Sequence, residues 1–512
     1  MRKSFEMNHK MKTIRFLIAY VLFTAVFIFA FSVLNAQQGL PEPGPQRKVN
    51  IPLAQHKTLP NGLRVYVIQK NATPLVTVTL LNTAANSRIE SAGNEGLANF
   101  TAGMLTKGTT KRSAETIAEM TEFLGADLAA FAGWNSTRVR VSVTSDKLSD
   151  AMEIFSDVVL NPNFPESEFD LLKSQTLDNT KYNLTQPGFL TNYAASVFSF
   201  KEHPEDGTPE SINALKISQI KEFYKEYYQP KNSFLIFVGD ITEQRALQLA
   251  SKYFGSWKNK TTAADSKPAV FNRQKGAEDS GNFTAKAENP RRILILDLPN
   301  SGQASVAYSA KLNVSRVTKS SYGKSVVNPD YYKAVVMNSI LGGGYSSRLN
   351  SEIRIKRGLS YGAGSSISWR FDSSNFIARA QTKTVSAAEV AQLMLAEIAK
   401  MISREVAETE LVPRKSSVIG GFSRNLETTD SLSNGVADLL QFNLEPDVLA
   451  QFIANVDNVK AKDILSISAL INQGDLIIAG DYSQFREDLS KRFPDIKPLI
   501  IKASELDLSK LR

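Results

Sequence analysis

Cysteine and histidine, which commonly hold metals or act in catalysis, are scarce in this chain of 512 residues. It has no cysteine, which excludes a disulfide framework, a thiolate zinc site, an iron–sulfur ligand set and a cysteine nucleophile. Its histidines are His9, His56 and His203, and no two of them are spaced to share one metal. We interpret His56 and His203 as ordinary surface residues. The sequence therefore predicts no metal site made by this chain alone.

Three consecutive glycines, Gly342, Gly343 and Gly344, form a second pattern with chemical potential. A phosphate-binding loop requires Gly-Lys-Ser/Thr at its end, whereas Tyr345 and Ser346 follow here. We expect instead a flexible binding loop near a substrate, and a tight bend after a helix is the alternative.

The charge of the chain argues against a nucleic-acid partner. The net charge is +9, but the first fifteen residues contain five basic residues and one acidic residue. The remaining 55 basic and 50 acidic residues include no long basic run. The length also predicts more than one domain, because single cores stop growing at roughly 250–300 residues.

The N-terminus has the order of a secretory signal. Basic residues precede an uncharged apolar stretch at 16–34, and Ala36 provides a small residue before the polar Gln37. We expect residues 1–36 to be removed and the protein to be periplasmic. The stretch is also close to the ~20 residues that span a bilayer, so an uncleaved anchor facing the periplasm is the alternative.

The remaining chain has mixed α and β patterns. Residues 64–68, 76–80 and 137–144 alternate as strands do, while Ser113 and Ser218 precede helical periods. Two apolar strands at 233–238 and 475–479 both end in Gly-Asp. The polar segment 258–287 between them has the composition of a linker. We therefore predict two repeats, 37–257 and 288–512, with two unrelated α+β domains as the alternative.

Several motifs resemble the pitrilysin/insulysin/mitochondrial-processing-peptidase family, also called the insulinase family. They are found at residues 58–65 (TLPNGLRV), 94–98 (NEGLA), 105–109 (LTKGT), 227–230 (YYQP), 238–240 (VGD), 341–349 (LGGGYSSRL) and 357–362 (RGLSYG). The resemblance implies an α+β fold of two homologous repeats. Each repeat would have a mostly antiparallel sheet with helices on one face, and the two would close like a clamshell.

The zinc motif that the resemblance implies is degenerate in this sequence. Family members carry His-x-x-Glu-His on a helix after Gly-Leu-Ala, and a further Glu completes the ligand set. The matching positions are Asn99, Ala102 and Gly103, which supply neither ligands nor a general base. Asp178 is the one carboxylate near the position of the third ligand. We therefore expect no cofactor in this chain and zinc in a homologous partner subunit.

The resemblance assigns a different role to Arg354 and Tyr361. In the family, an Arg and a Tyr seven residues apart hold and polarise the substrate peptide. A guanidinium and a phenol can both donate hydrogen bonds to a developing oxyanion. The alternative is structural, with Tyr361 packed and Arg354 in an ion pair.

Three functions remain open on these grounds. The first is a non-catalytic subunit of a periplasmic metallopeptidase heterodimer, inactive alone, that lends Arg354 and Tyr361 to a partner for peptide hydrolysis. The second is an inert scaffold or peptide-binding protein on the same fold. The third is a peptidase with another metal centre, which the lack of clustered ligands disfavours. Peptide is the expected substrate, and membrane contact is expected only if the N-terminal segment is retained.

Overall fold

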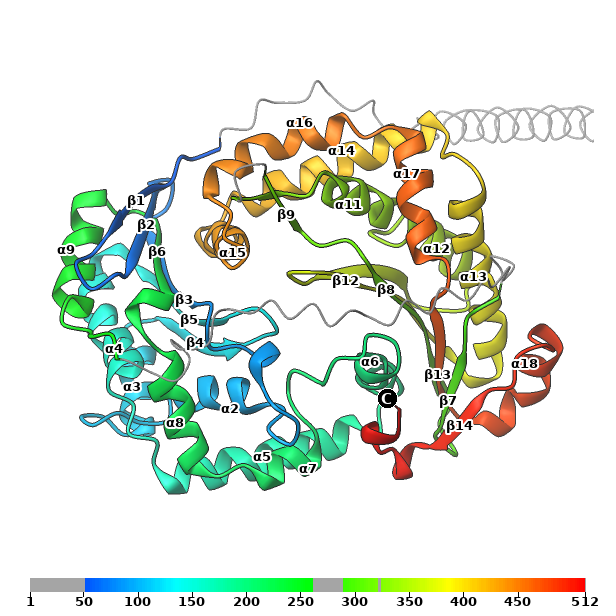
Figure 1. Cartoon of the computed structure of the whole chain (residues 1–512), viewed down its shortest axis with the longest axis horizontal. Helices are drawn as coiled ribbons and strands as arrows, with labels where there is room; N and C mark the ends of the chain where they lie inside the picture. The colour runs from blue at the N-terminus through cyan, green and yellow to red at the C-terminus, as the bar shows by residue number, and fades with distance from the viewer. Residues whose placement is uncertain (1–50, 261–288, 321–323, 512) are drawn as a thin grey trace, which may run out of the picture. The chain divides into compact units, whose positions relative to one another are not determined.

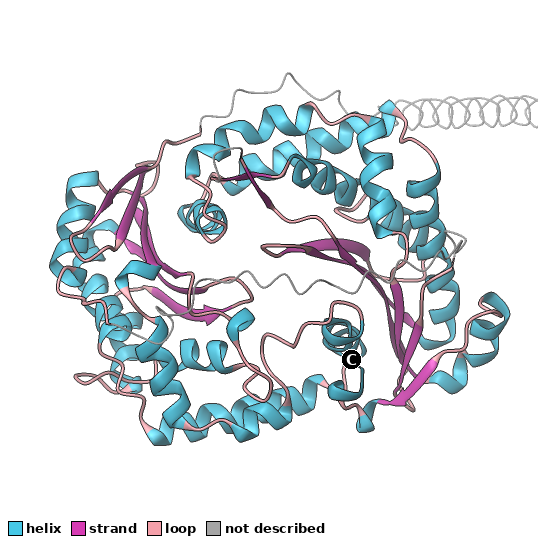
Figure 2. Ribbon diagram, viewed as in Figure 1, coloured by secondary structure: helices cyan, strands magenta, loops and turns pink. Residues whose placement is uncertain are grey.

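Two six-stranded β-sheets form the framework of the protein (Figures 1 and 2). The computed structural model describes residues 51–260, 289–320 and 324–511. The first sheet has the strand order β1 (Gln55–Thr58), β2 (Arg64–Gln69), β6 (Ser233–Gly239), β3 (Leu75–Asn82), β5 (Thr137–Thr144) and β4 (Asp127–Ala132). The second has the order β11 (Ala363–Trp369), β12 (Ser374–Lys383), β8 (Gln303–Leu312), β13 (Asp475–Gly480), β7 (Ile293–Asp297) and β14 (Leu499–Lys502). Among these strands β2 pairs in parallel with β6, and β7 pairs in parallel with β13 and β14. Both sheets are therefore mostly antiparallel, as the sequence predicts.

Helices occupy the connections between strands. Those of the first half are α2 (Leu97–Met104), α3 (Ala114–Phe123), α4 (Leu148–Leu160), α5 (Glu166–Asn183), α6 (Pro187–Phe198), α7 (Pro209–Ala214), α8 (Ile217–Tyr227) and α9 (Glu243–Phe254). Those of the second half are α11 (Pro329–Leu341), α12 (Arg348–Asn350), the π-helical turn η4 (Ser351–Ile355), α13 (Ala387–Ser403), α14 (Glu408–Asn425), α15 (Thr429–Leu440), α16 (Phe452–Asp457), α17 (Ala461–Ser468) and α18 (Arg486–Arg492). A small hairpin of β9 (Val317–Lys319) and β10 (Ser325–Val327) precedes α11. The α+β class is confirmed.

Local sequence signals explain where the elements begin. Strand β5 buries every second residue, which accounts for its alternating sequence. Helix α3 begins after Ser113, whose hydroxyl oxygen accepts a hydrogen bond from the Thr116 N–H at 3.1 Å. Helix α8 begins earlier than expected, because Gln219 accepts from the backbone N–H of Lys216 at 2.8 Å. Ser218 therefore lies inside α8 and does not cap it.

The two halves exchange a helix. Helix α6 belongs to the first half in sequence but packs on β8 and β13 of the second sheet. Helix α15 of the second half packs on β3 and β6 of the first sheet (Figure 1). The described residues, which begin at Ile51, accordingly form one compact unit.

Each sheet therefore has helices packed on both of its faces. On β13, Leu476 and Ile478 join the core beneath α13, whereas Ile477 and Ala479 face the core that contains α6. The sequence predicts helices on one face of each sheet. The helices of each half cover that face, and the exchanged helix covers the other.

Polar contacts accompany the exchange. Thr77 and Thr79 of β3 bond the hydroxyl groups of Thr429 and Ser433 on α15, at 2.9 and 2.8 Å. Arg138 of β5 pairs with Asp438 on the same helix at 2.6 Å. These contacts fix α15 on a sheet face that is more polar than an ordinary core.

Two sequence predictions concern segments that the structure does not describe. The predicted signal segment, 1–36, lies outside the described residues, and so does most of the predicted linker, 258–287. In the part of the chain that is described, no helix combines the length and apolar character needed to cross a bilayer.

Candidate functional site

Helix α2 carries the positions where the family places its zinc motif. The helix forms as the sequence predicts, with Leu97, Phe100 and Met104 buried on one side. Gly96 precedes it with φ of 90°, and a side chain there would collide with the Asp206 carbonyl. The backbone of α2 is therefore held in place, and the difference from the family's zinc motif lies in the side chains of the helix.

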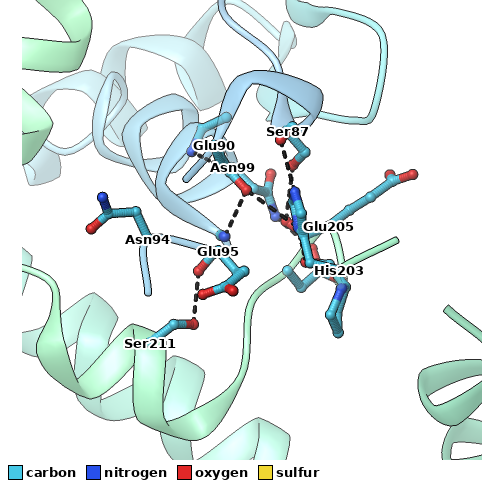
Figure 3. Close-up of polar contacts among 12 residues, drawn as sticks. Ser87, Glu90, Asn94, Glu95, Asn99, His203, Glu205 and Ser211 are labelled. Carbon is cyan, nitrogen blue, oxygen red and sulfur yellow. Dashed lines mark hydrogen bonds and ion pairs between the residues drawn. The ribbon is translucent and has the colours of Figure 1, made fainter. Parts of the chain in front are cut away.

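Asn99 is engaged in structural hydrogen bonds. Its Nδ2 donates to Asp206 Oδ1 at 2.7 Å, and its Oδ1 accepts from the backbone N–H of Ala132, the last residue of β4, at 3.1 Å. The amide thereby ties α2 to the edge strand of the first sheet. Figure 3 shows Asn99 among the polar contacts at this end of the helix.

The other two motif positions offer no ligand. Ala102 is fully buried, and a side chain at Gly103 would meet Leu172 of α5. Asp178, near the position of the third ligand, is an exposed residue of α5. Within residues 51–260, 289–320 and 324–511, no group of three or more His, Asp or Glu side chains is arranged to hold a metal. The residues of this region do not fit a zinc ion.

A buried carboxylate supports the start of α2. Glu90 accepts hydrogen bonds from the backbone N–H groups of Gly96 at 3.0 Å and Ala98 at 2.6 Å. These donors sit at the positive end of the helix, where a carboxylate is favoured. Burial nevertheless dominates and raises the pKa of Glu90 to about 8.

His203 is not the surface residue that the sequence predicts. Its side chain is 13% exposed and lies 3.6 Å from Glu90. Its Nε2 is 3.0 Å from the Ser87 carbonyl oxygen, and its Nδ1 is 3.1 Å from that of Pro204 (Figure 3). The ring also packs against Trp134 at 5.0 Å between centroids. No sequence signal links His203 to Glu90, because 112 residues separate them.

This cluster extends into the second half. Arg370 bonds Glu202 at 3.0 Å and Glu205 at 3.2 Å, and its guanidinium lies over Trp134. Burial raises the pKa of Glu205, against the effect of Arg370. The charged side chains of this cluster thus pair with one another.

The second candidate site is a groove on the second sheet. It has a volume of about 1300 Å³ and is bounded by the start of α6, the loop at 358–362 and strands β11, β12 and β8. Arg354 and Tyr361 both line it, so the structure brings together the two residues that the resemblance singles out. Asn99, Ala102 and Gly103 do not line this groove.

The side chains of this pair are available to a ligand. Tyr361 is 96% exposed, on the loop that follows η4. Arg354 lies near the end of η4 and over the ring of Tyr345, 5.2 Å from its centroid. Neither the hydroxyl of Tyr361 nor the guanidinium of Arg354 has a hydrogen-bond partner among the described residues.

The three glycines have different surroundings. The carbonyl of Gly342 accepts from the N–H of Ser365 on β11 at 3.1 Å, and a Cβ at Gly342 would lie 2.2 Å from that nitrogen. A Cβ at Gly343 would meet Ser339 at 2.7 Å, whereas a Cβ at Gly344 would make only an ordinary contact with Arg414 at 3.9 Å. Gly342 lines the groove, while Gly343 and Gly344 do not. The first two glycines permit the tight bend after α11.

Two family models match the chain. One is described as insulinase (peptidase family M16) and matches residues 64–192. The other is described as the peptidase M16 inactive domain and matches residues 214–416.

Similar proteins carry zinc-protease names. An uncharacterized zinc protease, YmxG, from Bacillus subtilis is 24% identical over 389 residues, which cover 75% of this chain and 87% of that protein. The zinc protease PqqE of Helicobacter pylori is 24% identical over 428 residues, or 82% of this chain and 90% of that protein.

Solved structures support the same fold. A peptidase M16 inactive domain from Pseudomonas fluorescens superposes with a TM-score of 0.71 at 23% identity, covering 84% of this chain and 98% of that one. A protease from Helicobacter pylori superposes with a TM-score of 0.73 at 22% identity, covering 84% and 100%.

Proposed function

The chain belongs to the insulinase family of peptidases, M16, and on that premise we propose that it is the subunit of a heteromeric peptidase that binds no zinc itself. It would bind peptide substrate and present Arg354 and Tyr361 to the scissile bond. A homologous subunit would supply the metal and the general base. The chain would therefore be inactive alone and required in the complex.

The state of α2 supports the first part of this proposal. Asn99 is committed on both sides of its amide, to Asp206 and to the N–H of Ala132. The side chain of Ala102 has no polar atom to offer, and Gly103 has no side chain. A metal bound here would have to displace structural hydrogen bonds and would find no set of ligands.

The single observation that carries the proposal is the placement of Arg354 and Tyr361. Both line one open groove, and a phenol ring that is 96% exposed gains nothing from packing. A guanidinium and a phenol without partners among the described residues can each donate a hydrogen bond to a carbonyl oxygen that gains charge during hydrolysis. A structural role for the pair would instead require internal contacts for Tyr361.

The test is reconstitution with a homologue that carries an intact His-x-x-Glu-His motif. Each purified chain and their mixture would be assayed on a fluorogenic peptide, and the zinc content of each would be measured after dialysis against a mild chelator. We expect turnover in the mixture alone, with zinc in the homologue. Turnover by the homologue alone at the same rate would contradict the proposal.

A catalytically inert scaffold or peptide-binding protein is the second candidate. The groove is consistent with this second candidate, because a peptide could bind in it without any partner subunit. It would be preferred if no zinc-bearing subunit associates with this chain while peptide still binds to it.

We also propose that the chain acts in the periplasm, on the strength of the basic and then apolar sequence at 1–34. Fractionation of cells that carry a C-terminal tag tests this point, and N-terminal sequencing shows whether cleavage follows Ala36. A full-length chain in the cytoplasmic fraction would contradict the proposal.

A further inference from the structure

Among the described residues, the charged side chains that line the groove are all basic. They are Arg354, Arg379 and Lys383, and the described lining includes no Asp or Glu. Across the described residues, none of these three cations has an ion-pair partner. Glu352, close to Arg354 in sequence, is instead paired with Lys356 and Arg357.

This arrangement differs from that of other arginines in the molecule. Arg112 pairs with Asp157 at 2.6 Å and Arg348 pairs with Glu410 at 2.7 Å, each with its side chain largely buried. Three cations line one groove, and the described residues that line it include no counter-charge, which makes the groove attractive to anions.

The strand geometry sets the spacing of two of these charges. On β12, Arg379, Gln381 and Lys383 are exposed, and the alternate residues Ala378, Ala380 and Thr382 are buried. Arg379 pairs in register with Ala307 and Lys383 with Gln303 on β8, so the strand is regular between them. At about 3.3 Å per residue, Arg379 and Lys383 are roughly 13 Å apart along one face of the sheet.

The opposite side of the groove comes from α6. Gln186, Gly188 and Phe189 line it, so the first turn of this twelve-residue helix borders the hollow. The N-terminal end of a helix carries partial positive charge, which adds to the effect of the side chains. Hydrogen bonding between Thr191 of α6 and Ser305 of β8 at 3.0 Å holds this side in place.

We propose that the groove selects acidic peptides in extended conformation, with two carboxylates four residues apart that meet Arg379 and Lys383. An extended peptide has the same rise per residue as β12, so side chains at the first and fifth positions share a face and match the two cations. This inference rests on the proposed function only in taking peptide as the ligand. It adds the class of peptide that would be held beside Arg354 and Tyr361.

The test measures binding to the purified full chain, without any partner subunit. The probe is a fluorescein-labelled nine-residue peptide of alanine and serine with glutamate at its third and seventh positions. Matched peptides carry glutamine or lysine there, and another carries its glutamates three residues apart. From two ion pairs we expect the first peptide to bind about tenfold more tightly than the glutamine peptide, with the difference reduced by salt.

Variants locate the effect. Arg379→Gln with Lys383→Gln should abolish the preference for glutamate. The matched control, Arg486→Gln with Lys491→Gln, removes the same charge from α18, which packs with α13 behind the sheet, and should leave binding unchanged. Melting curves would establish that each variant is folded.

Several outcomes would overturn the inference. These are equal binding of glutamate and glutamine peptides, no binding of the glutamate peptide, an unchanged preference in the groove variant, or displacement by oligothymidylate as effective as by the unlabelled peptide. Failure of the proposed function would give a different result. Turnover or the partner subunit would be absent, while the chain alone would still prefer the glutamate peptide.

Discussion

The region around α2 in the first half and the region around η4 in the second half hold polar side chains in contrasting ways. Around α2, Asn99, Glu90 and His203 all face partners within the molecule. Beside η4, Arg354 and Tyr361 line a groove and leave their donors available to a ligand.

The two regions share one structural feature. In each, an asparagine binds a backbone N–H of an edge strand. Asn99 accepts from Ala132 of β4, and Asn350 accepts from Ala363 of β11 at 3.2 Å. The two regions therefore differ in the side chains that surround this shared asparagine contact. Where side chains satisfy each other they support the fold, and where they are left without partners they are available to a ligand.

The largest expected effect comes from Tyr361→Phe, which tests whether the second region is functional. Loss of one donor to an oxyanion typically lowers turnover by about 10²–10³. Turnover of the reconstituted complex should fall by that order while assembly, followed by size-exclusion chromatography, is retained. Tyr182→Phe on α5 is the matched control, because Tyr182 is also exposed and lies outside the groove. Equal rates for both variants would remove the catalytic distinction between the regions.

The pH dependence of stability tests the first region. Burial raises the pKa of Glu90 from 4.5 to about 8. Between these two pH values the folded protein holds a proton on Glu90 that the unfolded chain has lost. Stability from this group is full below about pH 4.5 and falls as the pH rises toward 8, by at most about 1.4 kcal/mol per pH unit. Urea unfolding at pH 6 and pH 8 should show a smaller decrease for Glu90→Gln than for the wild type. A decrease of the same size would mean that Glu90 does not titrate in this range.

Asn99→Ala should have a smaller effect, confined to stability. It leaves the Ala132 N–H and the Asp206 carboxylate without their partner, and we expect a loss of about 1–2 kcal/mol in the free energy of unfolding. Peptide binding in the groove should be unchanged, as measured by fluorescence anisotropy. Weakened peptide binding would show that the two regions are coupled and not separate.

The smallest effect is expected for zinc content. Asn99→His combined with Gly103→His restores two imidazoles but neither the general base nor the third ligand. Elemental analysis after dialysis should find no stoichiometric zinc, as for the wild type. About one tightly held zinc per chain would show that the first region retains more of a metal site than its side chains indicate.

Local features of this fold are readable from the sequence. The alternation at 137–144 and the apolar strands ending in Gly-Asp each depend on residues close together in the chain. The degenerate motif on α2 is also local, so the family resemblance can be matched to Asn99, Ala102 and Gly103 position by position.

Long-range features are not readable in this way. The burial of His203 depends on Ser87 and Glu90, and the exchange of α6 and α15 depends on sheets formed by the other half. The alternation of Arg379, Gln381 and Lys383 is visible in the sequence. That this face borders a groove depends on α6, which lies nearly two hundred residues earlier in the chain.

The exchange of α6 and α15 also governs how the chain can fold as it is synthesised. The first sheet acquires its sixth strand at β6, but the helix that covers its polar face begins at Thr429, 190 residues after Gly239. Helix α6 likewise waits for β8 and β13 before it has a surface to pack on. Neither half can bury all of its surface until almost the whole chain is present, so an incomplete chain leaves one face of a sheet open. A break between the halves would yield fragments that complete their cores only by finding each other.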